Sequence, residues 1–174
     1  WIWGYREVDK LGGPDPYSAS KGAAEIAINS YAKSFFHIPN SKVRIASARA
    51  GNVIGGGDWA ANRIVPDCIR SWSKGKTVYL RNPKSTRPWQ HVLEPLSGYL
   101  TLALKLDLEQ SFNGQAFNFG PASNETKTVL DLVEEMSKYW VKVNWKLINE
   151  KEGFHESALL KLNCDKALYF LDWQ

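Results

Sequence analysis

Several large classes of protein are excluded by what this sequence of 174 residues lacks. Its 2 cysteines, Cys68 and Cys164, are too few for a disulfide framework and have no metal-ligand spacing, so we expect buried thiols and no metal site. No apolar run approaches the roughly 18 residues of a membrane-spanning helix, and no signal peptide opens the chain. These absences predict a globular, cytoplasmic protein that does not bind a membrane.

Phosphate-binding motifs are also missing. Neither GxGxxG nor the Walker pattern occurs anywhere in the chain. The formal net charge is +4, but the lysines and arginines are scattered rather than clustered. Nucleic acid is therefore not expected as a partner, and a phosphorylated small molecule fits the charge better.

The composition suits one domain with a sizeable core, because 44% of the residues are hydrophobic. Hydrophobic periodicity predicts alternating helices and strands. The expected helices are 16–36, 65–73, 96–106, 129–140 and 165–171, and the expected strands are 43–48, 77–80, 116–120, 143–147 and 159–162. Thr128 suits the N-cap of the fourth helix. This alternation predicts an α/β fold with a mainly parallel sheet.

The first predicted helix carries a tyrosine and a lysine four residues apart, Tyr17 and Lys21. Asp15 suits its N-cap and Pro16 its first position. Side chains at i and i+4 share one helix face, so the phenol and the ammonium can serve one site. A phenol is a weak base at neutral pH, and a lysine cation favours its deprotonated form. The spacing also arises by chance in a chain with 7 tyrosines, so an ordinary amphipathic helix remains open, and its apolar positions would also suit a partner subunit.

Two further segments are candidates for ligand contact. Residues 49–57 place glycines after a predicted strand, where the backbone can approach a ligand closely. Residues 81–91 are dense in cations and donors, and Arg87 beside a proline and an indole suits an anion clamp. A glycine turn without a ligand and an exposed basic turn are the alternatives.

Three motifs together carry a resemblance: YSASK at 17–21, RAGNVIGGGDW at 49–59 and TRPWQHV at 86–92. The chain strongly resembles the extended short-chain dehydrogenase/reductase family and, within it, the nucleotide-sugar dehydratase branch. The resemblance implies the C-terminal part of a Rossmann fold plus a smaller substrate-binding region. Residues 1–57 would complete the NAD-binding domain, and residues 58–174 would mostly bind the nucleotide sugar before returning to the Rossmann sheet.

The resemblance also implies residue roles, with NAD as cofactor and CDP-glucose as substrate. Tyr17 would accept the proton of the sugar 4-hydroxyl, and Lys21 would contact the nicotinamide ribose. The nucleotide diphosphate would be contacted by Asn52, Arg63, Arg87 and Asn118. The two asparagines equally suit hydrogen bonds to neighbouring backbone groups.

The resemblance covers the second half of such an enzyme. Trp1 is not an initiator methionine, so we expect an internal piece of a longer protein, inactive alone and oligomeric when complete. His91 stands where many sister enzymes have tyrosine, Asp172 where the family has glycine, and we assign no role to His91 or His155. A sister dehydratase, an epimerase, or a non-catalytic half-protein remain alternatives.

Overall fold

A computed structural model of the chain describes residues 3–148 and 159–174. His155 lies outside the described residues. Helices and strands alternate along the chain, as the sequence predicts. The helices are α1 (Pro16–Tyr31), α2 (Ile64–Trp72), α3 (Leu93–Leu108), α4 (Val129–Ser137) and α5 (Asp165–Leu171). The strands are β1 (Ser47–Ala50), β2 (Asn52–Ile54), β3 (Val78–Leu80), β4 (Thr86–Arg87), β5 (Trp89–His91), β6 (Ala116–Phe119), β7 (Lys127–Thr128) and β8 (Trp145–Leu147).

The strands form two-stranded pairs rather than one continuous sheet. Among the described residues, β1 pairs with β6, β2 with β5 and β3 with β8, all parallel, and β4 pairs with β7 antiparallel. The predicted α/β class and the predominance of parallel pairing are confirmed. The strand expected at 159–162 is reduced to isolated bridges at its two ends, to Thr86 and to Tyr5.

The first strand begins four residues later than expected. The predicted strand 43–48 fails in its first half because other groups take up the backbone there. The Ile45 N–H donates to the Asn113 side chain at 2.9 Å, and the Ile45 carbonyl accepts from Gly114 N at 2.7 Å. The ladder with β6 starts at Ser47, whose N–H reaches the Gln115 carbonyl at 2.8 Å.

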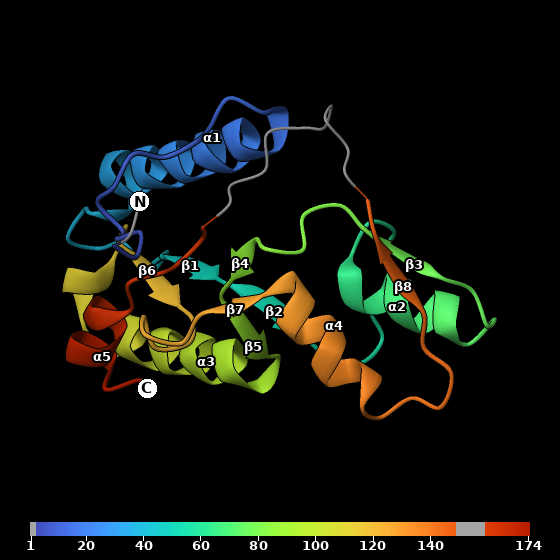
Figure 1. Cartoon of the computed structure of the whole chain (residues 1–174). Helices are drawn as coiled ribbons and strands as arrows, with labels where there is room; N and C mark the ends of the chain where they lie inside the picture. The colour runs from blue at the N-terminus through green and yellow to red at the C-terminus, as the bar shows by residue number, and fades with distance from the viewer. Residues whose placement is uncertain (1–2, 149–158) are drawn as a thin grey trace.

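The β1–β6 pair lies between helices, with α1 above one face and α3 and α5 below the other (Figure 1). One core cluster fills the lower side: Leu102, Phe112, Phe117, Phe119, Ala167, Leu171 and Trp173. The absence of a side chain at Gly98 lets α3 approach β6 closely, since a Cβ there would stand 2.3 Å from the Phe119 ring. This close packing holds β6 against its lower helices.

A second core cluster lies between α2, α4 and the β3–β8 pair (Figure 1). Its buried members are Cys68, Trp72, Val78, Leu80 and Val133. The cap predicted at Thr128 is confirmed, because its hydroxyl accepts from Asp131 N and the Asp131 carboxylate accepts from Thr128 N. The helix that follows ends at Ser137, three residues before the predicted end.

The two thiols are free but differ in burial. Cys68 is fully buried, and burial raises the pKa of its thiol to about 12. Cys164 is half-buried, its thiol donates to the Gly120 carbonyl at 3.6 Å, and burial raises its pKa to about 11. The expectation of two buried thiols is therefore right for the first and too strong for the second, which sits at the start of α5 near the surface.

The outer face of α1 differs from expectation. The spacing of Ala24, Ala27, Ile28, Tyr31 and Phe35 predicts an apolar stripe, yet these residues are exposed except for the half-buried Ile28. The fully buried residues are instead Gly22 and Ala32. A π-helical turn, Ala32–Phe36, continues the helix to the predicted end. Within the described residues, every helix is too short or too polar to cross a bilayer.

Candidate functional site

The start of α1 is fixed by its cap. The Asp15 carboxylate accepts from Ser18 N at 2.9 Å and from the Ser18 hydroxyl at 2.6 Å, and these hydrogen bonds, the hydroxyl's first, lower the pKa of that carboxyl. Pro16 occupies the first turn, where its missing N–H costs nothing. The predicted helix start is confirmed, and it puts Tyr17 in the first turn and Lys21 in the second.

Tyr17 and Lys21 lie together and are open to solvent. The Lys21 ammonium is 5.8 Å from the centroid of the Tyr17 ring. The tyrosine is 72% exposed. In the part of the chain that the structure describes, no hydrogen bond or ion pair engages the phenol or the ammonium. Both groups are therefore available to a ligand.

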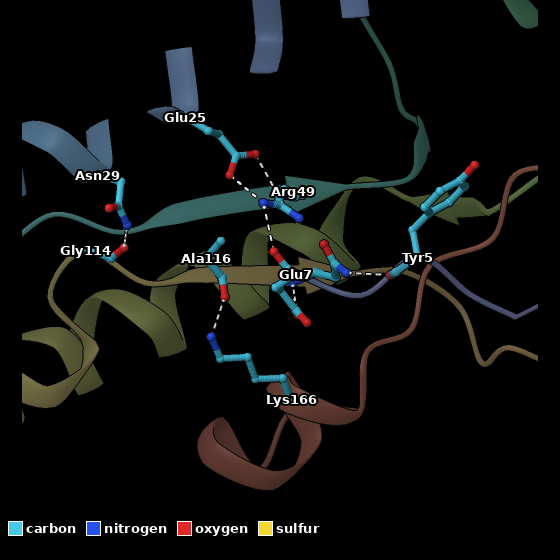
Figure 2. A network of polar contacts seen from close by, with 9 residues as sticks. Tyr5, Glu7, Glu25, Asn29, Arg49, Gly114, Ala116 and Lys166 are labelled. Atoms are coloured by element: carbon cyan, nitrogen blue, oxygen red, sulfur yellow. Dashed lines mark hydrogen bonds and ion pairs between the residues drawn. The ribbon is translucent and has the colours of Figure 1, made fainter. Parts of the chain in front are cut away.

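Two polar side chains further along the same helix bond it to β1 and to the turn before β6 (Figure 2). Arg49 on β1 donates from Nε and from NH2 to the two carboxylate oxygens of Glu25, both at 2.6 Å. Asn29 donates to the Gly114 carbonyl at 3.1 Å. The first two turns of α1 are therefore open to solvent, whereas its later turns are hydrogen-bonded to the rest of the fold.

Asn118 lies in the middle of this network. It is 1% exposed, and its amide nitrogen donates to the Tyr5 carbonyl at 2.9 Å and to the Asn163 carbonyl at 3.1 Å. Its backbone N–H donates to the Glu7 carboxylate at 2.8 Å. The side chain therefore joins the N-terminal segment and residue 163 to β6. This is the backbone-satisfying role that the sequence left open beside ligand contact.

Lys166 closes the network from below. Its ammonium donates to the Ala116 carbonyl at 2.9 Å (Figure 2). The same group lies 4.5 Å from the centroid of the Phe117 ring. Burial lowers the pKa of this lysine by desolvating the cation. The contact fixes α5 to the strand that carries Asn118.

Arg87, the predicted anion clamp, is 8% exposed, so it is not part of an exposed basic turn. Its NH1 group donates to the Thr86 carbonyl at 2.8 Å. Four buried polar side-chain atoms have no hydrogen-bond partner among the described residues, and three of them lie on this segment: Thr86 Oγ1, Trp89 Nε1 and Gln90 Oε1; the fourth is Asn118 Oδ1. Such atoms are rare in folded proteins, and here three of the four gather on one segment.

The glycine turn meets this clamp segment directly. Asn52 pairs with Trp89 in the β2–β5 ladder, and its N–H donates to the Pro88 carbonyl at 2.9 Å. A Cβ at Gly51 would stand 2.5 Å from that carbonyl, so this glycine serves chain packing. By contrast, a Cβ at Gly56 or Gly57 would meet no atom within 4 Å, and Gly57 has φ +79°. The backbone is therefore accessible at the far end of the turn.

Arg63 precedes α2, and its NH1 group donates to the Asp58 carboxylate at 2.6 Å. Arg70 on α2 donates to the Trp59 carbonyl at 2.6 Å. Hydrogen bonds from Ala60 N and then from Arg63 hold the pKa of the Asp58 carboxyl below its usual value. The loop after the glycines is thus shaped by two arginines, of which Arg63 is largely exposed.

The predicted site residues thus fall into groups. Tyr17 and Lys21 share one open helix face, and strand pairing brings Asn52 next to the segment that carries Arg87. Asn118 is enclosed in the network below α1. Among the described residues, no group of three or more histidine, cysteine or carboxylate side chains could hold a metal ion.

Comparison with known proteins identifies the family. The model of the "NAD dependent epimerase/dehydratase family" matches residues 6–120, more than half of the chain. The chain belongs to this family. A relative in Salmonella typhimurium, named CDP-glucose 4,6-dehydratase, is 48% identical over 177 residues, which cover 99% of this chain and 49% of the relative. The chain therefore spans about half the length of that curated relative.

Solved structures agree on the family's fold. A dTDP-glucose 4,6-dehydratase from Bacillus anthracis, in complex with NAD, superposes with a TM-score of 0.75 at 20% identity, over 99% of this chain and 50% of that one. A UDP-glucose-4-epimerase from Stenotrophomonas maltophila, with bound NAD, gives 0.76 at 18% identity, over 98% and 53%. At these identities the likeness shows the fold alone, and it confirms the predicted Rossmann-type α/β class.

The family motifs do not include Glu25 or Glu7, and Arg49 opens the motif at 49–59 without a role assigned to it, although all three enter the network below α1. One signal was available for the first of them, since Glu25 stands four residues after Lys21 on the same helix. Its partner is 24 residues away in sequence, and no local pattern identifies it.

Proposed function

We propose that this chain supplies the second half of an NAD-dependent nucleotide-sugar 4,6-dehydratase, a lyase that converts CDP-glucose to CDP-4-dehydro-6-deoxyglucose in deoxysugar biosynthesis. The observation that carries the proposal is the Tyr17–Lys21 pair, open to solvent at the start of a capped helix. The 48% identity to a CDP-glucose 4,6-dehydratase along nearly the whole chain supports the choice of sugar nucleotide.

The residues of this chain would act on the sugar as follows. The Tyr17 oxygen accepts the proton of the 4-hydroxyl, and the Lys21 cation stabilises the phenolate and donates to the nicotinamide ribose. NAD, when bound, supplies a hydride acceptor at the sugar carbon. The exposure of both side chains, with no other polar partner among the described residues, fits this contact.

Arg87 is our first choice for the diphosphate contact, and Arg63 is the second. A guanidinium matches phosphate geometry better than an ammonium does. The buried polar atoms beside Arg87 support this choice, because an anion bound there would give donors such as Trp89 Nε1 a partner. Asn52 belongs to the same place through its pairing with Trp89. For Asn118 the two hydrogen bonds of the amide nitrogen favour a supporting role, and its Oδ1, buried without a partner among the described residues, is the atom left for a ligand.

We further propose that two parts of the chain bind different ligands, as the motifs imply. Residues 1–57 would complete the NAD-binding domain, and residues 58–174 would mostly bind the sugar nucleotide. The exposed apolar side chains of α1, Ile26, Tyr31 and Phe35, would suit a subunit contact in a cytoplasmic homo-oligomer. Sedimentation of the full-length protein tests the last point, and a monomer at micromolar concentration contradicts it.

The direct test of function uses the full-length protein, in which this chain follows its dinucleotide-binding half. We expect it to release a 4-keto sugar nucleotide from CDP-glucose and to prefer CDP-glucose to dTDP-glucose and UDP-glucose. Preference for another sugar nucleotide would indicate a sister dehydratase, and a C4 epimer as product would indicate an epimerase. We expect the 174-residue chain alone to give no product, since the fingerprint for NAD is absent from it.

Tyr17→Phe tests the catalytic assignment in the full-length protein. The substitution keeps the ring and removes the hydroxyl, so we expect kcat to fall by at least 10²-fold, with CDP-glucose binding retained. Tyr139→Phe, at an exposed tyrosine just after the end of α4, is the matched control. Wild-type turnover in Tyr17→Phe would refute the assignment.

Arg87→Ala tests the clamp through binding. We expect the affinity for CDP, measured by calorimetry in the full-length protein, to fall about 10-fold or more, in line with a charge-assisted contact of about 1.5–3 kcal/mol. Arg81→Ala, at an exposed position of the same turn, is the control. Equal CDP affinity in wild type and Arg87→Ala would reject the clamp.

A further inference from the structure

Four side chains of α1 follow one another at intervals of four residues: Tyr17, Lys21, Glu25 and Asn29. Four residues turn an α-helix by about 400°, which is about 40° past a full turn, and advance it by about 6 Å. The four side chains therefore form one slowly turning stripe along the helix. Its first two members are open to a ligand, and its last two are bonded to β1 and to the turn before β6.

The bond from Glu25 is the stronger of the two anchors. Both carboxylate oxygens accept from the Arg49 guanidinium at 2.6 Å, and both side chains are 21% exposed. Bidentate arginine–carboxylate pairs restrict orientation as well as distance. Figure 2 shows the carboxylate reaching down from α1 onto the strand.

Arg49 is itself held at the centre of the fold. It pairs with Asn118 in the β1–β6 ladder, and its NH2 group also donates to the Glu7 carbonyl at 3.4 Å. The anchor thus connects α1 to two strands and the N-terminal segment at once. Elsewhere on this helix and its π-helical extension, Gly22 and Ala32 are buried and Ile28 is half-buried, so the ion pair adds a directional charged contact to a face of small and apolar residues.

We propose that the Glu25–Arg49 ion pair positions the catalytic helix, setting the height and tilt of α1 and thereby the places of the Tyr17 hydroxyl and the Lys21 ammonium. The inference rests on the proposed function for its kinetic consequence, and on the geometry alone for the anchoring. Neither Glu25 nor Arg49 needs to touch substrate or NAD in this role.

The length of the helix makes the effect large. Tyr17 lies eight residues before Glu25, or about 12 Å along the helix axis. A tilt of about 5° at the anchor would therefore displace the tyrosine by about 1 Å. Displacements of that size in an active site cost up to about 10²-fold in rate. Loss of the pair should consequently affect the chemical step more than substrate binding.

Kinetics of Glu25→Gln in the full-length enzyme test the positioning. We expect kcat to fall 10- to 100-fold, the KM for CDP-glucose to stay within threefold, and the isotope effect with substrate deuterated at C4 to increase. Arg49→Lys keeps the charge but loses the fork, and should give a smaller loss of the same kind. A kcat that is unchanged, or that falls in proportion to folded protein with an unaltered isotope effect, would overturn the proposal.

Hydrogen exchange in the full-length protein tests the anchoring without any turnover. We expect the backbone amides of residues 19–22 to exchange faster in Glu25→Gln and those of α4 to stay unchanged. Glu135→Gln, which removes a carboxylate from the exposed pair with Lys138, is the matched control and should alter neither helix start nor kinetics. Unaltered exchange in α1 refutes the anchor even if the enzyme is active. Altered exchange in a full-length protein without 4-keto product supports the anchor and refutes the proposed function instead.

Discussion

Replacing Asn118 by aspartate exchanges one nitrogen for oxygen at constant shape, and it separates two roles for this residue. In the structure the amide nitrogen donates to the carbonyls of Tyr5 and Asn163, at 2.9 and 3.1 Å. A carboxylate oxygen in its place would face two acceptors without a proton to share. If the side chain supports the fold, Asn118→Asp should therefore destabilise it strongly.

The magnitude follows from the two lost hydrogen bonds. Each buried acceptor left without a donor costs about 1–3 kcal/mol, so we expect the free energy of unfolding to fall by about 2–6 kcal/mol at pH 7. Part of this loss should disappear in acid. Burial and the facing carbonyls raise the folded-state pKa of the introduced carboxyl above its unfolded value of about 3.9. The protonated carboxyl can donate a hydrogen bond, so the loss of stability is smallest below the unfolded-state pKa. The loss grows as the pH rises from there through the folded-state pKa.

Urea denaturation followed by tryptophan fluorescence measures this change, because the chain has 8 tryptophans. Asn29→Asp is the matched control. It removes the same kind of amide-to-carbonyl bond, 3.1 Å long, at an exposed site, and we expect a loss below about 1 kcal/mol.

The contrary result is equally definite. If Asn118→Asp unfolds at the wild-type urea concentration, while the full-length protein loses its affinity for CDP, the side chain serves the ligand and our reasoning from its burial is wrong. If Asn118→Asp loses both its stability against urea and its affinity for CDP, while Asn29→Asp keeps its CDP affinity and nearly all of its stability, the role in the fold is supported.

Two other predictions concern packing and pH. Gly98→Ala should lower the free energy of unfolding by about 1–2 kcal/mol, because overpacking costs about 1–3 kcal/mol and the gain in helix propensity is at most about 1 kcal/mol. Adding Phe119→Leu to this variant should reverse part of the loss. An unchanged melting temperature in Gly98→Ala would show that the Phe119 ring moves aside at no cost. Above pH 9.0, where unfolded thiols ionise, the buried Cys68 and the half-buried Cys164 should each lower the free energy of unfolding by about 1.4 kcal/mol per pH unit, up to folded-state pKa values of about 12 and about 11. Their contribution is fully present below pH 9.0, and Cys68→Ala should reduce the slope; denaturation at pH 8 to 11 with an identical slope in the variant would contradict this.

Local chemistry made part of the fold predictable. The start of α1 follows from Asp15 and Pro16, and that of α4 from Thr128, because caps act over three or four residues. The start of β1 did not follow from its own residues, since side chains and backbone far along the chain compete for its hydrogen bonds. The fold class survived this error because the alternation of helices and strands was still correct.

The candidate site divides in the same way. Tyr17 and Lys21 are found by spacing on one helix, and their proximity is confirmed. Spacing does not reveal the residues that hold this helix in place. Arg49 is 24 residues from its partner Glu25 in the sequence, and Asn118 is 113 residues from its partner Tyr5. Such contacts depend on which strands become neighbours, and hydrophobic periodicity does not determine that.

The four-residue spacing of the functional side chains on α1 has an evolutionary consequence. Point substitutions along the exposed face do not change the angle around the helix axis between the Tyr17–Lys21 pair and Glu25. A single inserted or deleted residue between Lys21 and Glu25 would rotate one half of the stripe against the other by about 100°, and the phenol would then face away from the groups it serves. Family members that keep this chemistry should therefore vary in composition along α1 while preserving its length between the tyrosine and the carboxylate.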